Sequence, residues 1–314
     1  MISAGRSCPA DYALPPKLFE AEPCGHCDTL YVAGGIYGNP EALKTLALLA
    51  DEENASLVVV NGDMHWFDKT AQDFIHTERL AEPYIKLIGN VEAELRRETD
   101  IGAGCGCAYP GCVSQEAVER SNLIHRELKE ALAFLPEYKA ALARRPGVAV
   151  VEVGKQRVAI SHGDEQFLAG WECSRESLAE AGRQTELARW MSQRRIDVLA
   201  TTHTCAPAAL AWGHGAVINN GAAGMPNFKG QFGGLITRIA ALPHQDALYR
   251  GKVGGLYIEA LPLRYDHEAF IRWFDDLWPQ ESPGEVSYRE RIVQGTEDEI
   301  EDALLGGFLR CNNK

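Results

Sequence analysis

The sequence predicts an α/β fold, and three observations support this class. Val58–Val60 are consecutive β-branched residues, a pattern typical of a strand that is buried on both faces. Asn61-Gly62 then breaks this strand and places Asp63 at its carboxyl end. Strands alternate with helical segments along most of the 314 residues, which favours one α/β core with additions.

The first strand and helix of this core are predicted near the amino end. Residues 29–33 form an apolar strand segment, and a Gly-rich turn follows it. Pro40 suits the first turn of a helix, and the leucines of residues 41–49 then share one helical side. A Gly-rich turn between a strand and a helix is typical of a loop that binds phosphate.

Residues 1–28 are predicted to be an N-terminal extension that packs on or beside the core. Its Cys24 and Cys27 have the spacing of half a zinc site or of a redox pair. Two unrelated thiols explain the same spacing, and the sequence leaves these alternatives open.

Polar side chains follow four predicted strands at the point where each strand ends. Asp63 follows residues 58–60, and the other three are Asn90 after residues 84–89, His162 after residues 158–161 and His203 after residues 196–202. Open α/β sheets place their ligands at the carboxyl ends of strands. One carboxylate, one amide and two imidazoles that arrive in this way predict a metal site assembled from loops.

The segment 102–113 is rich in glycine and is therefore predicted to be a loop rather than a helix. It carries Cys105, Cys107 and Cys112, and it follows Asn90 closely enough to lie near the metal centre. With Cys24 and Cys27 it offers five thiolates, enough for a structural zinc ion or an iron–sulfur cluster if the two stretches meet. A disulfide-forming or flexible loop is the alternative.

The remaining elements follow from apolar periodicity. Residues 116–145 are predicted to be helical with a break at Pro136, and residues 148–153 and 156–160 form a hairpin. A charged amphipathic helix is predicted over residues 175–194. Later elements are predicted at residues 216–218, 235–240, 256–261 and 264–266 (strands) and 268–277 (helix). Residues 279–314 are predicted to be an acidic C-terminal tail, in which 304–309 docks on the core or on a second subunit.

Composition limits the function classes. A formal net charge of −13 excludes nonspecific binding to nucleic acid or to anionic membranes, and an anionic substrate would need a local cation such as a metal ion. No segment has 18 consecutive apolar residues, and the first thirty residues lack the apolar run of a signal peptide. We therefore expect a cytoplasmic protein with its nine cysteines mostly reduced. A homo-oligomer is compatible with the sequence.

Short fragments of the sequence occur in the order of the motifs of a known family: Gly35–Leu43, Gly62-Asp63, Gly89–Glu92, His162–Asp164, Thr202–Cys205 and Asn219–Pro226. On these fragments, residues 29–278 resemble the calcineurin-like metallophosphoesterases, in particular the bacterial phosphodiesterase-like branch. The resemblance implies a sandwich of two mixed β-sheets flanked by helices in four layers, α-β-β-α. The Cys-rich loop 102–113 would be an insertion in that domain.

The resemblance also implies which residues bind metal. Two metals share the position of Asp63 in the family, and the second metal adds the positions of Asn90, His162 and His203, which are all present here. The first metal adds three positions that are Gly35, Tyr37 and Cys205 in this chain. One site is therefore intact, and the other has lost every unshared ligand. Cys205 is either a soft thiolate ligand or a small buried residue.

The function implied is hydrolysis of a small phosphorylated substrate, a phosphomonoester or phosphodiester, by water activated on one Zn, Fe or Mn ion. His65 and Asp164 are further catalytic candidates because each lies two positions beyond a ligand, and Lys229 is a candidate for binding substrate phosphate. Each of these three is otherwise an exposed polar residue. The alternative functions are a catalytically inactive metal- or ligand-binding protein and a thiol-rich redox or metal-handling protein.

Overall fold

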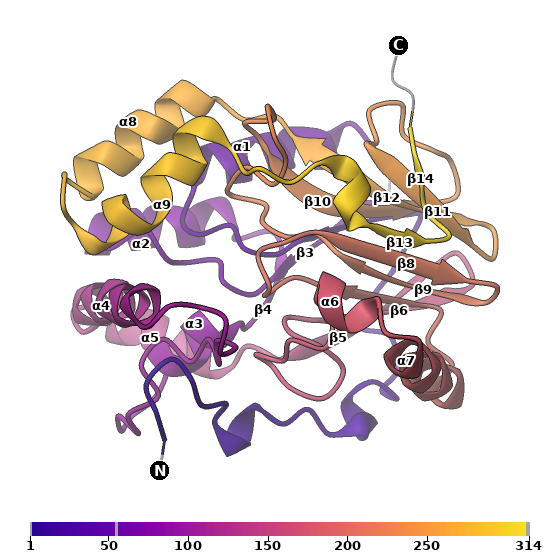
Figure 1. Cartoon of the computed structure of the whole chain (residues 1–314), viewed down its shortest axis with the longest axis horizontal. Helices are drawn as coiled ribbons and strands as arrows, with labels where there is room; N and C mark the ends of the chain where they lie inside the picture. Colours follow the sequence, from indigo (N-terminus) through magenta and orange to yellow (C-terminus); the bar gives the residue numbers. More distant parts are fainter. Residues whose placement is uncertain (1, 54–55, 312–314) are drawn as a thin grey trace.

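Two mixed β-sheets pack face to face in the computed structural model, which describes residues 2–53 and 56–311 (Figure 1). The first sheet has the order β1 (His26–Cys27), β5 (Val148–Val153), β6 (Gln156–Ser161), β7 (Val198–Thr201), β9 (Gly215–Asn219), β8 (Ala208–Trp212) and β13 (Leu304–Gly306). The second sheet has the order β14 (Leu309–Arg310), β11 (Tyr249–Val253), β12 (Leu256–Leu263), β10 (Gly234–Ala240), β2 (Thr29–Ala33), β3 (Ser56–Asn61) and β4 (Ile85–Leu87).

The valines of β3 show why this strand lies in the middle of the protein. Val59 belongs to the apolar cluster between the two sheets, together with Leu30 of β2 and Val158 of β6. Val58 and Val60 point to the opposite face, where they join the cluster beneath the helices. Successive side chains of a strand alternate between faces, so both faces of β3 are buried, as its sequence predicts.

Helices cover the two outer faces and complete the predicted four layers. Figure 1 shows α1 (Pro40–Asp51) and α8 (His267–Leu277) on the upper side of the sheets and α7 (Ala181–Arg194) on the lower side. Helix α7 packs Leu187 and Met191 against the first sheet. The α/β sandwich that the sequence predicts is confirmed.

Parallel pairing brings the strand ends to one edge. Strands β2, β3 and β4 are parallel neighbours in the second sheet, and β6, β7 and β9 are parallel neighbours in the first. The loops after these strands therefore meet at their carboxyl ends, where the predicted ligands lie. Short helices α2 (Ala71–Leu80), α3 (Asn90–Leu95) and α6 (Arg175–Leu178) extend from this region.

The long predicted helix is two helices, α4 (Gln115–Leu132) and α5 (Pro136–Ala143), with the break at Pro136 as expected. The predicted strand 264–266 is wrong. Strand β12 ends at Leu263, and Asp266 is instead the N-cap of α8, where its Oδ1 accepts a hydrogen bond from the Ala269 amide at 2.9 Å. A capping carboxylate stabilises the first turn of a helix and ends the preceding extended segment.

The segment after residue 278 docks on the core, which is one of the two arrangements expected for residues 304–309. Residues 279–311 contain α9 (Pro283–Gln294), a 3₁₀ turn (Ile300–Ala303) and the edge strands β13 and β14. Helix α9 contacts α4 and α8, and the two strands pair with β8 and β11. This segment therefore belongs to the sandwich, as Figure 1 shows for α9 beside α8.

The N-terminal residues pack on the core, which is one of the two arrangements expected for residues 1–28. Two 3₁₀ turns (Ala10–Tyr12 and Pro16–Leu18) precede β1, and the side chains of Tyr12 and Phe19 are fully buried. Strand β1 already pairs with β5, so the sheet begins inside the predicted extension. In the described ranges, no helix has the length and apolar character needed to cross a membrane.

Candidate metal centre

Four side chains from four strand ends meet in the interior. The Nε2 atom of His162 lies 3.3 Å from Oδ2 of Asp63 and 3.2 Å from Oδ1 of Asn90. The Nδ1 atom of His203 lies 3.2 Å from the same His162 nitrogen. All four residues are buried. Among the described residues, Asp63, His162 and His203 form the one group of three or more His, Cys, Asp or Glu with ligand atoms within 4.8 Å of one another.

Tight turns bring these residues together. Asp63 and His203 have φ angles of +48° and +48°, and the φ of Gly62 is +74°. A Cβ atom on Gly62 would lie 2.4 Å from the backbone nitrogen of Gly89, so a side chain there would push the two loops apart. The Asn61-Gly62 pair that ends the strand in the sequence therefore also allows the two loops to touch.

One buried carboxylate holds the loops in register. Glu92 accepts hydrogen bonds from the backbone amides of Asp63 at 2.9 Å, Met64 at 2.8 Å and His65 at 3.2 Å. It also accepts one from the amide of Gly89 at 2.8 Å. The loop after β3 and the loop after β4 are thus fixed by a single side chain, the last residue of the Gly89–Glu92 fragment.

The outer ring nitrogens set the tautomers of the two histidines. Nδ1 of His162 lies 2.9 Å from the carbonyl oxygen of Asn61, and Nε2 of His203 lies 3.1 Å from that of Cys107. A carbonyl only accepts, so these two nitrogens carry the hydrogens of the neutral rings. The inner nitrogens therefore present lone pairs. The amide nitrogen of Asn90 donates to Cys105 O at 3.0 Å, which leaves its oxygen facing inward as well.

The electrostatics of the cluster favour a bound cation. Burial raises the pKa of Asp63, but the neighbouring His162 and His203 outweigh burial and lower it. Burial lowers the pKa of His162, but Asp63 outweighs burial and raises it. Burial and His162 together lower the pKa of His203 to about 3. A proton on His162 can form a hydrogen bond to Asp63, but it cannot bond to all the other inward-facing oxygen and nitrogen atoms at once. A metal ion can bind all of these atoms.

Comparisons with known proteins bear on the fold. No protein-family model matches the sequence, and no curated protein matches it. A hypothetical protein, PH1004, from Pyrococcus horikoshii OT3 has a similar structure with a TM-score of 0.60 and 14% identity, over 86% of this chain and 99% of that chain. A metallophosphoesterase from Sphaerobacter thermophilus is similar with a TM-score of 0.52 and 13% identity, over 85% of this chain and 100% of that chain.

The chain has the metallophosphoesterase fold. This confirms the fold that the sequence fragments implied. At these identities the likeness extends to the arrangement of strands and helices, so the chemistry of the site has to come from its own residues.

The positions that the resemblance assigns to a first metal hold a packed aromatic ring. The hydroxyl of Tyr37 lies 2.9 Å from the sulfur of Cys205, and a Cβ on Gly35 would lie 2.9 Å from the Tyr37 ring. Burial raises the pKa of Tyr37 well above its usual value, so the residue is a neutral phenol. Cys205 is outside the converging Asp63, His162 and His203 group and has Tyr37 as its partner.

His65 does not face the centre, although the sequence suggests it as a ligand or proton donor, because both of its ring nitrogens face other carboxylates. Its Nδ1 lies 2.6 Å from Oδ2 of Asp68, and its Nε2 lies 3.0 Å from Oε1 of Glu78. Its ring stacks on Phe74 with the centroids 3.7 Å apart. Burial lowers the pKa of His65, but Asp68 and Glu78 outweigh burial and raise it to about 9. The ring is a charged partner of two buried carboxylates, so neither nitrogen is free.

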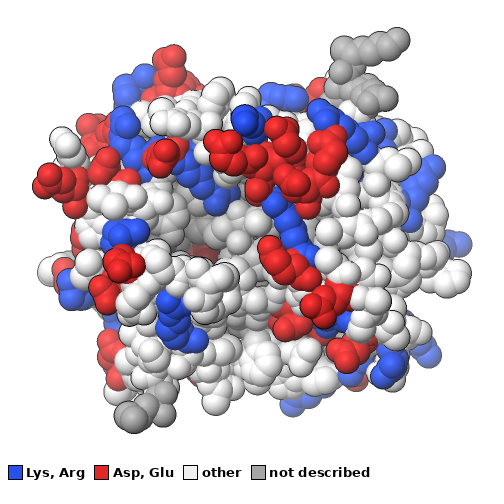
Figure 2. Space-filling model, in the orientation of Figure 1, with Lys and Arg blue, Asp and Glu red and all other residues white. Residues whose placement is uncertain are grey.

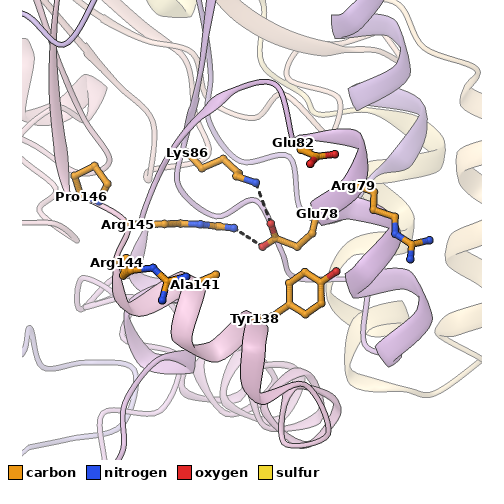
Figure 3. Close-up of a pocket in the computed structure, with 9 residues that line it drawn as sticks. All are labelled: Glu78, Arg79, Glu82, Lys86, Tyr138, Ala141, Arg144, Arg145 and Pro146. Carbon is orange, nitrogen blue, oxygen red and sulfur yellow. Dashed lines mark hydrogen bonds and ion pairs between the residues drawn. The ribbon is translucent and has the colours of Figure 1, made fainter.

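The carboxylate of Glu78 connects this cluster to the surface. Figure 3 shows that it also binds Arg145 and Lys86, the latter at 3.2 Å, at the base of a surface pocket. This pocket has a volume of about 590 Å³ and lies between α2 and α5, away from the centre. The buried histidine, arginine and carboxylates therefore neutralise one another without a metal.

Asp164 is not placed for catalysis either. Its carboxylate accepts hydrogen bonds from the backbone amides of Phe167 at 2.7 Å, Gln166 at 2.8 Å and Glu172 at 3.2 Å. Burial and the nearby Glu165 raise its pKa to about 6. These bonds hold the loop after His162 together, so the Asp164 carboxylate is taken up by backbone amides of its own loop.

Lys229 lies outside the centre. Its side chain is exposed and forms an ion pair with Glu297 at 3.2 Å. The prediction that it binds substrate phosphate is therefore not supported by its position, because the cavity at the centre is lined by other residues.

The five cysteines of the predicted second metal site do not gather. Cys105 and Cys107 form a disulfide, Cys24 and Cys112 are exposed, and Cys27 is partly buried in β1. Among the described residues, these cysteines are not part of any group of three or more converging metal-binding side chains. The loop 102–113 does reach the centre, because Cys107 contacts His203.

A cavity of about 190 Å³ opens over the centre. Figure 2 shows a hollow near the middle of this face. Aromatic side chains form much of its wall, beside the cation Arg291: the aromatic residues are Tyr37, Trp66, Tyr109, Trp171 and Tyr288. The cavity therefore has largely uncharged, aromatic walls above a polar floor.

Arg291 is a residue that the sequence prediction missed. It lies on α9, and it donates hydrogen bonds from Nε to Pro226 O at 2.9 Å and from Nη2 to Cys205 O at 3.0 Å. Within the described ranges, no carboxylate forms an ion pair with it. The signal for α9 was present, since Ser282-Pro283 is a typical helix start, and Ser282 caps the helix. What the sequence lacks is any sign that this helix folds back over the centre.

Proposed function

We propose that this protein is a metal-dependent phosphoesterase with a single metal ion held by Asp63, Asn90, His162 and His203. The observation that carries the proposal is the convergence of four lone-pair donors, none of which holds a proton when both rings are neutral. Two imidazoles, a carboxylate and an amide oxygen suit Zn²⁺, Fe²⁺ or Mn²⁺. When bound, such an ion would polarise a phosphoryl oxygen and lower the pKa of a bound water toward neutrality.

Other groups of the protein would orient the ligands and bind the substrate. The carbonyl groups of Asn61 and Cys107 hold the two imidazoles in the orientation that presents their inner nitrogens. Arg291 offers a cation to the phosphate of a substrate, on the side of the cavity where Cys205 lies. A chain with a net charge of −13 needs such a local cation to retain an anion.

The substrate class that fits is a small phosphorylated molecule. The cavity volume of about 190 Å³ is small, and its aromatic walls favour a compact group attached to the phosphate. Phosphomonoesters and phosphodiesters both remain within this proposal, since the ion would act on the phosphoryl group that the two share.

The test is to measure metal content and hydrolysis together on the full-length protein. Metal analysis of the wild type should give about one ion per chain, and an aryl phosphomonoester or phosphodiester should be hydrolysed after loading with Mn²⁺, Zn²⁺ or Fe²⁺. Both properties should be lost in His162→Ala and Asp63→Ala. Lys229→Ala is the matched control, because its side chain is charged but exposed and outside the cavity.

The second candidate is a metal-binding protein without hydrolytic activity. The observation that favours this second function is the Tyr37 ring beside Gly35. The ring fills the space where a second metal ion would bind in a two-metal phosphoesterase, and that second ion would stabilise one of the two reacting oxygens. Metal that stays bound without hydrolysis of either ester, under all three ions, would support this second function and contradict the first.

A further inference from the structure

The surface pocket between α2 and α5 carries a surplus of positive charge. It shares no lining residue with the cavity over the candidate centre. Four cations and two carboxylates line it, and Figure 3 shows them with the uncharged residues of its wall: Arg79, Lys86, Arg144, Arg145, Glu78 and Glu82. In a chain with a net charge of −13, this local balance favours an anion over a cation as ligand.

Glu78 is the buried carboxylate of this pocket, and both of its oxygens are already bonded. Its Oε1 accepts a hydrogen bond from Nη2 of Arg145, and its Oε2 accepts one from Nζ of Lys86 at 3.2 Å. One carboxylate carries a single negative charge, so it cannot neutralise Lys86 and Arg145 together. The other carboxylate, Glu82, is exposed at the rim. The base of the pocket therefore keeps positive charge that an anion can neutralise.

Arg145 is the buried cation of the pocket, with 9% of its surface exposed. Figure 3 shows its guanidinium meeting the carboxylate of Glu78. Only Nη2 makes this contact, and the other terminal nitrogen, Nη1, is buried without a hydrogen-bond partner among the described residues. A buried donor without an acceptor is costly, and the two terminal nitrogens of a guanidinium together fit two oxygens of one oxyanion. Arg145 therefore keeps donor capacity for a ligand.

The exposed arginines of the pocket add to this charge. Arg79 lies in the last turn of α2, and Arg144 is the C-cap of α5. Both side chains are exposed. A cation at the carboxyl end of a helix is favoured by the helix dipole, which accounts for these two positions. It does not account for the burial of Arg145 beside Lys86, so that pair carries the argument for a ligand.

We propose that this pocket is a binding site for a small molecule that carries a phosphate group, held by Arg145, Lys86 and Arg144. The surplus of two positive charges matches a phosphate dianion better than a single carboxylate. The pocket volume of about 590 Å³ is in the range of small-molecule sites, and a phosphate ion alone would leave most of it empty. The phosphate is therefore joined to a larger group, which packs on the ring of Tyr138.

The test is calorimetric titration of the full-length wild type and of Asp63→Ala with inorganic phosphate. Asp63→Ala removes a proposed metal ligand and leaves the pocket unchanged, so binding that persists in it does not come from the centre. We expect the same Kd in both proteins, and a Kd that rises with salt concentration. Acetate, the carboxylate probe, should bind more weakly than phosphate. Adenosine monophosphate, tested on Asp63→Ala, should bind more tightly than phosphate because its base can pack on Tyr138.

Variants of the arginines assign the site. Arg145→Gln should weaken phosphate binding at least about tenfold, the equivalent of losing one hydrogen bond to a charged group, and Arg145→Lys should lie between it and wild type. Arg144→Gln should weaken binding about threefold. Its side chain is exposed, so this variant keeps the proposal testable if circular dichroism shows that Arg145→Gln is unfolded. Arg126→Gln is the matched control, because it removes an exposed arginine that does not line the pocket.

Failure of this inference is distinct from failure of the proposed function. Phosphate binding that is absent from Asp63→Ala, or that is unchanged in the folded arginine variants of the pocket, would overturn the site and leave the metal centre intact. Equal weakening in Arg126→Gln would overturn it as well, because the attraction would then be nonspecific. Acetate that binds as tightly as phosphate would overturn the phosphate assignment, and adenosine monophosphate that binds no more tightly would overturn the role of Tyr138.

Discussion

Two buried clusters of histidine and carboxylate, one containing Asp63 and the other His65, differ in the groups that their ring nitrogens face. In the cluster of Asp63, His162 and His203, the inner ring nitrogens face other acceptors. In the cluster of His65, each ring nitrogen faces a carboxylate, Asp68 on one side and Glu78 on the other. In the first cluster, the inward-facing acceptor atoms outnumber the protons available to them. In the second cluster, the protonated His65 ring supplies a positive charge beside the two carboxylates.

The difference teaches that residue types alone do not identify a metal site. A buried histidine beside an aspartate is a ligand where its free nitrogen meets further lone pairs, and a structural ion pair where it meets only carboxylates. In the first cluster, backbone carbonyl groups accept hydrogen bonds from the outer nitrogens of His162 and His203. The inner nitrogens are therefore left as ligands. The following predictions test this comparison.

The largest effect is expected from removing an inner nitrogen. His162→Ala should lose the metal ion and reduce phosphoester hydrolysis about 10³-fold, the rate equivalent of roughly 4 kcal/mol of transition-state stabilisation. His65→Gln should keep about one ion per chain, with folding checked by circular dichroism. Equal metal loss in both variants would break the comparison, because the two clusters would then act as one.

The next effect concerns stability against pH. The pKa of His65 is about 9 in the folded protein, raised by Asp68 and Glu78 against the effect of burial, and about 6.5 in an unfolded chain. A raised pKa means that the stabilisation is complete below about pH 6.5 and is lost as pH rises through about 9. The loss should be roughly 3 kcal/mol, the equivalent of this difference in pKa.

Urea unfolding between pH 6 and pH 10 measures this change. The difference in the free energy of unfolding between wild type and His65→Gln should shrink over that range, because the glutamine side chain of the variant does not titrate. A constant difference would mean that His65 is neutral in the folded protein, and the contrast between the two clusters would then be smaller than the structure indicates.

A smaller effect is expected at the wall of the cavity. Arg291→Gln removes the cation proposed for substrate phosphate and should raise KM about 10- to 100-fold, since hydrogen bonds to charged groups contribute roughly 1.5–3 kcal/mol. Metal content should stay the same, because Arg291 contacts the carbonyl groups of Pro226 and Cys205 and none of the proposed ligands. A variant with unchanged KM and lower metal content would reverse this assignment.

The smallest effect is expected at the surface. Lys229→Ala breaks the exposed ion pair with Glu297 and should change the free energy of unfolding by less than about 0.5 kcal/mol. Its kcat/KM for an aryl phosphate should stay within about twofold of wild type. A large loss of activity would show that the substrate extends beyond the cavity described above.

The sequence predicts the strand ends well because their signals are local. The valines of β3 and the Asn61-Gly62 turn define both the strand and the exit of Asp63, and parallel pairing then brings His162 and His203 to the same edge. By contrast, one of the two partners of His65 is Glu78 on α2, and no sequence pattern between these residues predicts the pairing.

Long-range packing explains the other differences. Strand β8 is the alanine-rich segment Ala208–Trp212 and lacks the β-branched residues that predict a strand, so its burial comes from its neighbours β9 and β13. Arg291 reaches the cavity because α9 folds back over residues that are far away in the chain. Asp164 lies two positions beyond a ligand, but the turn formed by residues 164–172 takes up its carboxylate.

The hydrogen bonds of Glu92 bear on how the protein would take up its ion. One buried side chain restrains the exits of two strands before any ligand arrives, so entry of a cation needs little rearrangement of the backbone. The entropy lost in ordering these two loops is then lost during folding rather than during metal binding. More of the free energy of coordination therefore contributes to metal affinity. Amide hydrogen exchange at Asp63, Met64 and Gly89 should consequently be slow in the metal-free protein and change little when the ion is added.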